Sequence, residues 1–360
     1  LPTLSTILFL ISLVSFSFVS IIFLSRLFSP THIRLKHRSS PLIERDSVEL
    51  GFVQYWPAGF ALAGVSFGCF AVAEGRVKGR WAMAVYICWW ITALWMGITG
   101  FFILGAYMSH STVLVRSKTS PGRGLPLIAV LGGVTGGATV VLAGAVMCLP
   151  GSGAFLEKQK IISDGMAAPV VIFCYCGIGG LLLLAVLTYA VVMHELLLVT
   201  GWPPPELTGV MFYLVGPLGQ SAGALLILGE VVGNGHYLGD LDNRTGGRKT
   251  GGLPIATTVS VFFGMLLFGM GGFFLILAIV CLVYRAYRRE LEWSCTWNGS
   301  VFPLGTLAFS SLWLSYELES GFFRILTLVL VIICFGLFVL LLGFNLKMAV
   351  RSRVFRVEDE

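Results

Sequence analysis

The segment Phe322–Lys347, FFRILTLVLVIICFGLFVLLLGFNLK, decides the fold class. Between Arg324 and Lys347 it holds no charged residue, and as an α-helix it is long enough to cross a hydrocarbon core of about 30 Å. The whole chain of 360 residues is 56% hydrophobic and 12% charged, whereas a soluble domain carries about 25% charged residues. The sequence therefore predicts an all-α polytopic membrane protein.

Eight further apolar runs of similar length precede this segment. The nine predicted transmembrane spans cover residues 4–28, 54–74, 81–107, 125–148, 168–194, 208–232, 255–284, 300–317 and 322–347. The first run has no basic leader and is too long for the apolar part of a signal peptide, so it is interpreted as a membrane helix. We expect the spans to form a single transmembrane domain over residues 1–360.

Lysine and arginine residues in the loops predict the orientation of the chain. Loops 29–50, 108–124 and 285–299 and the tail from Lys347 hold 14 of them, and the opposite loops hold 8. The first set, with the C-terminus, is predicted to be cytoplasmic. The glycosylation sequon at Asn243 then falls in an outer loop, whereas the sequon at Asn298 lies inside and against a span.

Glycine and proline are concentrated in alternate spans. At helical spacing three stripes form: Pro57 with Gly64 and Gly68, Gly133 with Gly137 and Gly144, and Gly216 with Gln220 and Gly223. Close helix packing explains any single stripe. The recurrence in alternate spans instead favours helical hairpins with one member facing an inner axis. Pro217 and Pro303 would free backbone carbonyls, which is tolerated where a helix borders protein or water.

The spans offer no chemistry that an enzyme would need. Charged residues lie at span ends, and no Ser–His–Asp group, carboxylate pair, phosphate-binding loop or metal-ligand spacing can be assembled. An intramembrane enzyme is the alternative from a different class, and it would require such groups inside the bundle. We therefore expect no enzyme, no metal and no cofactor. The eight cysteines are predicted to be free thiols, and the scattered basic residues do not indicate a nucleic-acid partner.

The stretch 299–311, GSVFPLGTLAFSS, combines a proline, glycines and hydroxyls in a way that a lipid-facing helix does not need. Together, Phe212–Ala222 (FYLVGPLGQSA) and Trp297–Thr306 (WNGSVFPLGT) resemble the tellurite-resistance/dicarboxylate transporter family. That family includes bacterial tellurite-resistance channels, plant slow anion channels, fungal malic acid permeases and fungal sulfite efflux pumps. The forms GPLGQ and FPLGT are most similar to the sulfite-pump branch.

The resemblance implies ten helices, arranged as five hairpins around a central pore, and usually a homotrimer. Odd-numbered helices line the pore in this family. The glycine-rich second, fourth, sixth and eighth spans would match family helices three, five, seven and nine. We therefore expect the first family helix to be missing upstream of Leu1.

The resemblance also implies export of a small anion across the plasma membrane, with sulfite as the first choice and malate as the alternative. Voltage and the anion gradient would drive efflux. The phenylalanine that plugs the pore in plant and bacterial relatives corresponds to Phe302. The predicted path is lined by Gly64, Gly68, Gly133, Gly137, Gly216, Pro217, Gly219, Gln220, Ser221, Pro303, Gly305, Thr306 and Ser310. Hydrogen bonds from Gln220, Ser221, Thr306 and Ser310 to the anion are expected.

Overall fold

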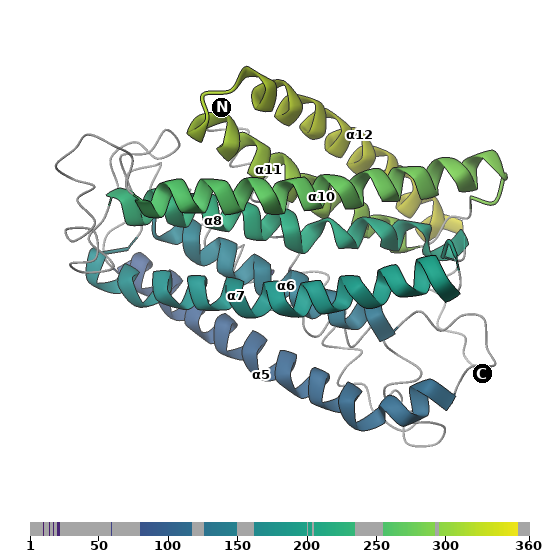
Figure 1. Ribbon diagram of the computed structural model, residues 1–360, viewed down its shortest axis with the longest axis horizontal. Helices are drawn as coiled ribbons and strands as arrows, with labels where there is room; N and C mark the ends of the chain where they lie inside the picture. The colour runs from purple at the N-terminus through teal and green to yellow at the C-terminus, as the bar shows by residue number, and fades with distance from the viewer. Residues whose placement is uncertain are drawn as a thin grey trace. The chain divides into compact units, whose positions relative to one another are not determined.

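The computed structural model describes residues 80–116, 126–149, 162–199, 201–203, 205–234, 255–291 and 295–351, together with Leu10, Val14, Ser17, Ser20, Ile21 and Gly59. The α-helices in these ranges (Figure 1) are α5 (Arg80–Arg116), α6 (Pro126–Met147), α7 (Asp164–His194), α8 (Gly216–Asn234), α10 (Ile255–Tyr287), α11 (Val301–Glu317) and α12 (Gly321–Arg351). A π-helix, η1 (Glu195–Val199), extends α7, and two 3-10 helices are η2 (Pro205–Leu214) and η3 (Cys295–Ser300). No strand occurs in the described ranges, so the all-α prediction is confirmed.

Five helical segments in the described part of the chain are long and apolar enough to cross a membrane. They are Ala82–Phe101, Gly165–Leu198, Thr208–Gly233, Ile255–Tyr287 and Gly321–Asn345. The predicted spans 125–148 and 300–317 are also helical, as α6 and α11, but α11 has only 17 residues. The predicted spans 4–28 and 54–74 lie outside the described residues except at the single positions named above. The total of nine spans therefore stays a prediction.

By its internal contacts the chain forms two compact units. The first comprises residues 1–199 and 224–262, and the second comprises 200–223 and 263–360, so that α8 and α10 each contribute to both. In the first unit, α6 packs against both α5 and α7 (Figure 1). The second unit contains η2, the start of α8, most of α10, and the η3–α11–α12 segment.

Glycine allows close helix packing in the first unit. A methyl group added at Gly144 would lie 2.6 Å from the Trp89 ring and 2.7 Å from the Cys174 sulfur, so α6 meets α5 and α7 at this point without room for a side chain. The indole of Trp89 also donates a hydrogen bond of 2.8 Å to the carbonyl oxygen of Val140. A methyl group added at Gly137 would lie 2.6 Å from the side chain of Leu181 on α7. Close packing, one of the two interpretations of this stripe, thus operates at both glycines.

In the second unit, α11 and α12 form a tight hairpin. The amides of Glu319 and Ser320 bond back to the carbonyls of Tyr316 and Ser315, and Glu319 adopts a positive φ of 47°. This is the Schellman arrangement that satisfies the last carbonyls of a helix. The hydroxyl of Ser311 donates to the carbonyl of Phe323 across the hairpin at 3.1 Å. The turn and this bond hold α11 against α12 near the turn, and the bond from the Cys334 thiol to the carbonyl of Val301 at 3.4 Å does so at the start of α11.

The far end of α12 lies beside η3. The side-chain amides of Asn298 and Asn345 exchange hydrogen bonds, at 2.7 Å from Asn345 to Asn298 and 3.4 Å in the reverse direction. Ser300, the third residue of the Asn298 sequon, is buried, and its hydroxyl donates to the carbonyl of Trp297. Both Asn298 and Ser300 of this sequon therefore make contacts within the second unit. The start of α11 and the end of α12 lie at the same end of this unit.

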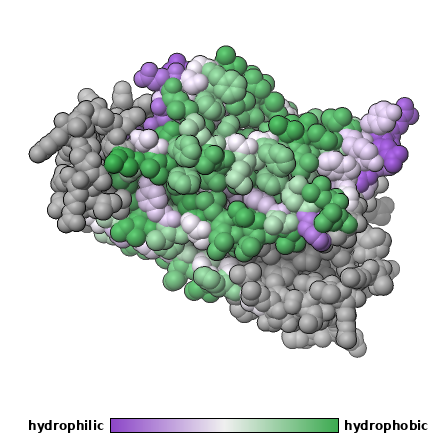
Figure 2. All heavy atoms as spheres, viewed as in Figure 1, coloured by the Kyte–Doolittle hydropathy of each residue, from purple (hydrophilic) through white to green (hydrophobic). Residues whose placement is uncertain are grey.

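The outer faces of α10 and α12 are apolar. One stripe of α12 is exposed at 60–67% and consists of Phe322, Ile325, Leu328, Ile332 and Phe335. Figure 2 shows that the viewed face of the described helices is predominantly hydrophobic. By contrast, 89% of an apolar 18-residue stretch of Thr208–Gly233 is buried, whereas only 17% of the corresponding stretch of Gly321–Asn345 is buried. Most of α8 is therefore buried within the structure, whereas α12 exposes an apolar face of the kind that lipid or another helix covers.

Candidate functional site

The start of α8 packs directly on α11. A methyl group added at Gly219 would lie 2.7 Å from the hydroxyl oxygen of Thr306 and 3.0 Å from the amide nitrogen of Leu307. One turn later, a methyl group at Gly223 would meet Phe309 at 3.0 Å and Ser310 at 3.2 Å. Both contacts advance along the two helices in the same direction, so α8 and α11 run parallel here. Glycine at 219 and 223 is what allows this approach.

The start of each helix is marked by a proline and a preceding 3-10 helix. Pro217 is the second residue of α8, and Pro303 is the third residue of α11. In the first turn the backbone N–H has no intrahelical partner, so a proline there removes no hydrogen bond. Pro217 and Pro303 therefore lie where a 3-10 helix changes to an α-helix, and the freed carbonyls predicted from the sequence stay a prediction. The Gly216-Pro217 pair inside an apolar run was the signal for this helix start.

The hydroxyls on α11 already donate to backbone carbonyls. Thr306 donates to the carbonyl of Pro303 at 2.8 Å, and Ser310 donates to the carbonyls of Gly219 and Thr306, the latter at 3.0 Å. Because a hydroxyl carries a single hydrogen, an anion would compete with these carbonyls for it. The Ser310 bond also links α11 to α8, so Ser310 joins the two helices in this structure.

Most of the remaining predicted site residues of α8 and α11 are buried. Gln220 is 0% exposed and Ser221 2%, and Gly216, Pro217 and Pro303 are also buried. Phe302 is half-buried in the first turn of α11. A methyl group added at Gly305 would lie 3.8 Å from the sulfur of Cys334, an ordinary contact, so the chain has room beside this glycine.

The predicted lining residues of the earlier spans are only partly described. Gly133 and Gly137 lie half-buried on α6, and Gly137 faces Leu181 of α7. Gly64 and Gly68 lie outside the described residues. The structure thus brings together the predicted residues of α8 and α11, and the contribution of the second and fourth spans to a path stays a prediction.

Charged groups are excluded from the fully buried positions of the described chain. Every fully buried polar residue there is a serine, a threonine or Gln220. The described cysteines Cys88, Cys148, Cys174, Cys176, Cys281 and Cys334 are free thiols. Within the same ranges, no three His, Cys, Asp or Glu residues gather in a way that could hold a metal ion. The buried surface of α8 and α11 is therefore uncharged, with a few serine, threonine and glutamine side chains among mostly apolar ones.

Two structural features near this site were not predicted from the sequence. One is the packing of η2 on η3, where Gly299 faces the ring of Tyr213. The other is a cluster around Arg285 at the end of α10, described below. The three consecutive prolines 203–205 were a usable signal for the cluster, because such a segment has carbonyls but no N–H groups.

Comparison with known proteins supplies the family. The family model described as voltage-dependent anion channel matches residues 1–346 of the chain. No curated protein and no solved structure gives a match. The matched region includes α8, α11 and both motifs that carried the resemblance. The chain therefore belongs to the voltage-dependent anion channel family, which is the family that its motifs indicated.

Proposed function

We propose that this anion channel or transporter exports sulfite from the cytoplasm. The proposal rests on the uncharged buried surface that α8 and α11 share, in which the polar side chains of Gln220 and Ser221 lie among apolar ones. A path without fixed cations binds an anion weakly enough to release it, which conduction requires. The sequence forms GPLGQ and FPLGT support sulfite over malate.

Backbone charge supports the attraction of an anion to such a path. The parallel contacts place the first turns of α8 and α11 at the same end of the second unit. A helix N-terminus carries the equivalent of roughly half a positive charge. Because η2 and η3 lead directly into α8 and α11, this charge belongs to the starts of the two 3-10 helices, and it would favour an anion there.

The membrane potential supplies a sufficient driving force. A monoanion that leaves a negative cytosol gains about 2.3 kcal/mol per 100 mV. The described helices carry no fully buried aspartate, glutamate or histidine that would suit obligatory proton coupling. We propose passive efflux that follows voltage and the anion gradient.

A flux assay tests both the substrate and the driving force. The protein is reconstituted in sealed vesicles, and efflux of radiolabelled sulfite and of malate is followed at imposed voltages. We expect sulfite efflux that rises with voltage and needs no pH gradient when the sulfite speciation is held fixed. Saturable malate efflux without sulfite efflux would indicate a dicarboxylate transporter and would refute sulfite export. A requirement for a pH gradient would refute passive efflux.

Gln220→Leu tests whether the amide contacts the anion. Leucine keeps a similar volume but removes the donor, so we expect sulfite flux to fall about tenfold while the oligomer size is unchanged. Thr188→Val on α7 is the control, because its hydroxyl bonds only within its own helix, to Leu184, at 2.7 Å. Equal loss of folded protein and of flux in Gln220→Leu would show that the amide holds helices together instead.

We also propose a homotrimer in the plasma membrane, with the C-terminus in the cytoplasm. The trimer and the plasma membrane rest on the family resemblance. The orientation rests on the excess of basic residues in loops on one side, among them Arg285, Arg288 and Arg289. Protease protection of a C-terminal tag in sealed right-side-out vesicles measures the orientation.

A further inference from the structure

The 3-10 helix η2 is unusually long. It extends over ten residues, Pro205–Leu214, and passes directly into α8 at Gly216. Runs of 3-10 helix longer than three or four residues are uncommon, because their hydrogen-bond geometry is poorer than that of an α-helix. Contacts outside η2 must therefore hold it in this form.

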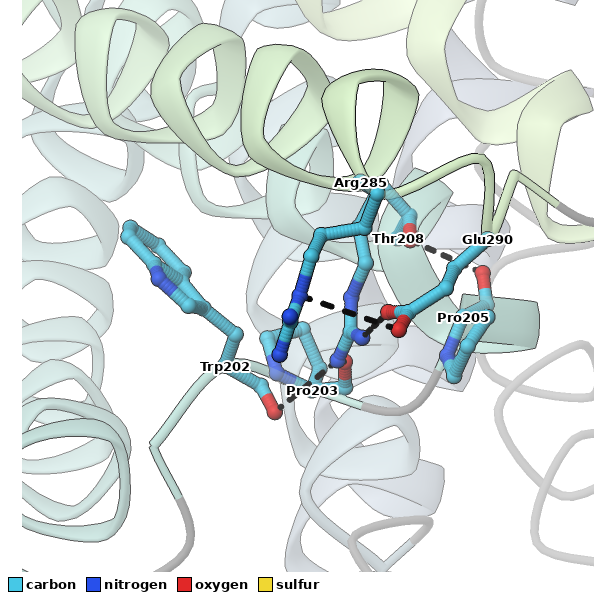
Figure 3. Close-up of polar contacts among 7 residues, drawn as sticks. Trp202, Pro203, Pro205, Thr208, Arg285 and Glu290 are labelled. Carbon is cyan, nitrogen blue, oxygen red and sulfur yellow. Dashed lines mark hydrogen bonds and ion pairs between the residues drawn. The ribbon is translucent and has the colours of Figure 1, made fainter.

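The first of these contacts is made by Arg285 at the end of α10. Its guanidinium donates to the carbonyl of Pro203 at 2.5 Å and to that of Trp202 at 3.5 Å (Figure 3). These carbonyls lie just before η2, in a segment where Pro203, Pro204 and Pro205 supply no N–H groups. Arg285 thus satisfies carbonyls that their own segment leaves without donors, and it ties the entry of η2 to α10.

The end of α10 is folded so that Arg285 stays in place. The amide of Glu290 bonds back to the carbonyl of Arg285 at 3.0 Å, and Arg289 takes a positive φ of 57°, so the chain reverses. This reversal brings the carboxylate of Glu290 onto the guanidinium of Arg285. The Arg285 side chain is only 13% exposed, against 56% for Arg288. The guanidinium is therefore paired, shielded from water and held between two segments.

The other end of η2 is held by η3. Gly299 leaves space for the ring of Tyr213, and η2 packs along η3 and the start of α11. Because η2 is fixed at both ends, the position of Gly216 and of the Gly219 contact with Thr306 depends on how far η2 extends. The rise per residue is about 2.0 Å in a 3-10 helix and 1.5 Å in an α-helix. Rewinding ten residues would shift the start of α8 by about 5 Å.

We propose that Arg285 is a positioning residue for the anion path. It keeps η2 extended and thereby sets the axial position of the Gly219–Gly223 face against α11. Glu290 assists by holding the guanidinium. This role rests on the proposed function, because it requires that α8 and α11 form the anion path. The hydrogen bonds from Arg285 to the segment before η2 do not depend on that function.

Hydrogen–deuterium exchange of the whole protein in lipid nanodiscs tests the tie. In Arg285→Gln, we expect amides 206–215 to exchange about tenfold faster, because a buried charge-assisted tie is lost. Arg288→Gln is the matched control, since it removes the same charge from an exposed position one turn away. Arg288 reaches Glu290 only at 3.9 Å and donates to neither Trp202 nor Pro203, so this exchange should be unchanged. Glu290→Gln is expected to give an intermediate increase, and it serves as the test if Arg285→Gln does not fold. Unchanged exchange in the folded variants would overturn the proposal.

The ratio of sulfite flux to malate flux separates positioning from loss of protein. Fewer folded molecules would lower both fluxes equally, whereas a shifted path should change their ratio at least about threefold in Arg285→Gln and not in Arg288→Gln. Faster exchange with an unchanged ratio would overturn the positioning role. If neither anion moves through the unsubstituted protein, the proposed function fails, while the exchange result still decides whether Arg285 holds η2.

Discussion

Gly219→Ala is expected to destabilise the protein by about 1–3 kcal/mol, the usual effect of adding a methyl group to a filled interface. The added carbon would lie 2.7 Å from the Thr306 hydroxyl and 3.0 Å from the Leu307 amide nitrogen. Neither atom can move away easily. The Thr306 hydroxyl is hydrogen-bonded to the carbonyl of Pro303, and the Leu307 amide belongs to the backbone of α11. Alanine favours a helix over glycine by at most about 1 kcal/mol, so the clash should decide the sign.

The measurement is the thermal unfolding of the purified protein in detergent, followed by loss of its folded oligomer. Gly305→Ala is the matched control, because the same methyl group would meet only the Cys334 sulfur at 3.8 Å. This control should be neutral or slightly stabilising. Gly219→Ala that unfolds at the same temperature as Gly305→Ala would mean that α8 and α11 separate easily at this contact.

Phe302→Ala is expected to raise basal anion flux about tenfold or more. A bulky apolar ring in a narrow path excludes water and resists a hydrated anion. Tenfold requires the ring to contribute only about 1.4 kcal/mol to the barrier. Phe302 is half-buried in the first turn of α11, next to Pro303 and three residues before Gly305, so large neighbours do not enclose it on its own helix. Sulfite and chloride flux in vesicles without an applied stimulus measures the effect.

Phe309→Ala is the control for this gate. The Phe309 ring lies 3.0 Å from the methyl position of Gly223 and 6.4 Å from the ring of Trp313, edge-on. It therefore packs α11 against α8, and its removal should lower stability by about 1–3 kcal/mol without raising flux per folded molecule. Phe302→Ala that folds well and conducts no more than the unsubstituted protein would leave this segment as a packing motif.

The bilayer explains why the long helices could be predicted. Segments such as 255–284 and 322–347 must hide every backbone polar group over about 30 Å, so apolar length alone indicates a helix. Length does not reveal the type of helix. The run 208–232 is one apolar segment in the sequence, yet it divides at Gly216 into a 3-10 helix and an α-helix. Only the position of Pro217 could have indicated the division.

The site could be predicted in part for a different reason. Small residues at helical spacing indicate a face where another helix approaches, but not which helix. That Thr306 is the residue against Gly219 depends on a contact between distant parts of the chain. The bonds of Thr306 and Ser310 to carbonyls three and four residues earlier are common for hydroxyls on helices, and this local rule could have been applied to the sequence.

The parallel contact of α8 and α11 constrains how relatives of this chain can diverge. Gly219 faces Thr306 and Gly223 faces Ser310, and each pair is separated by 87 positions. A change of size at one member leaves either a clash or a gap unless its partner changes too. Gly219 should, however, stay glycine whatever residue stands at 306, because the Leu307 amide nitrogen would still lie 3.0 Å from an added methyl group. Gly223 meets only side chains, so positions 223 and 310 should covary. A deletion of one residue between the two contacts of either helix would shift one pair out of register with the other, so insertions and deletions should accumulate outside these turns.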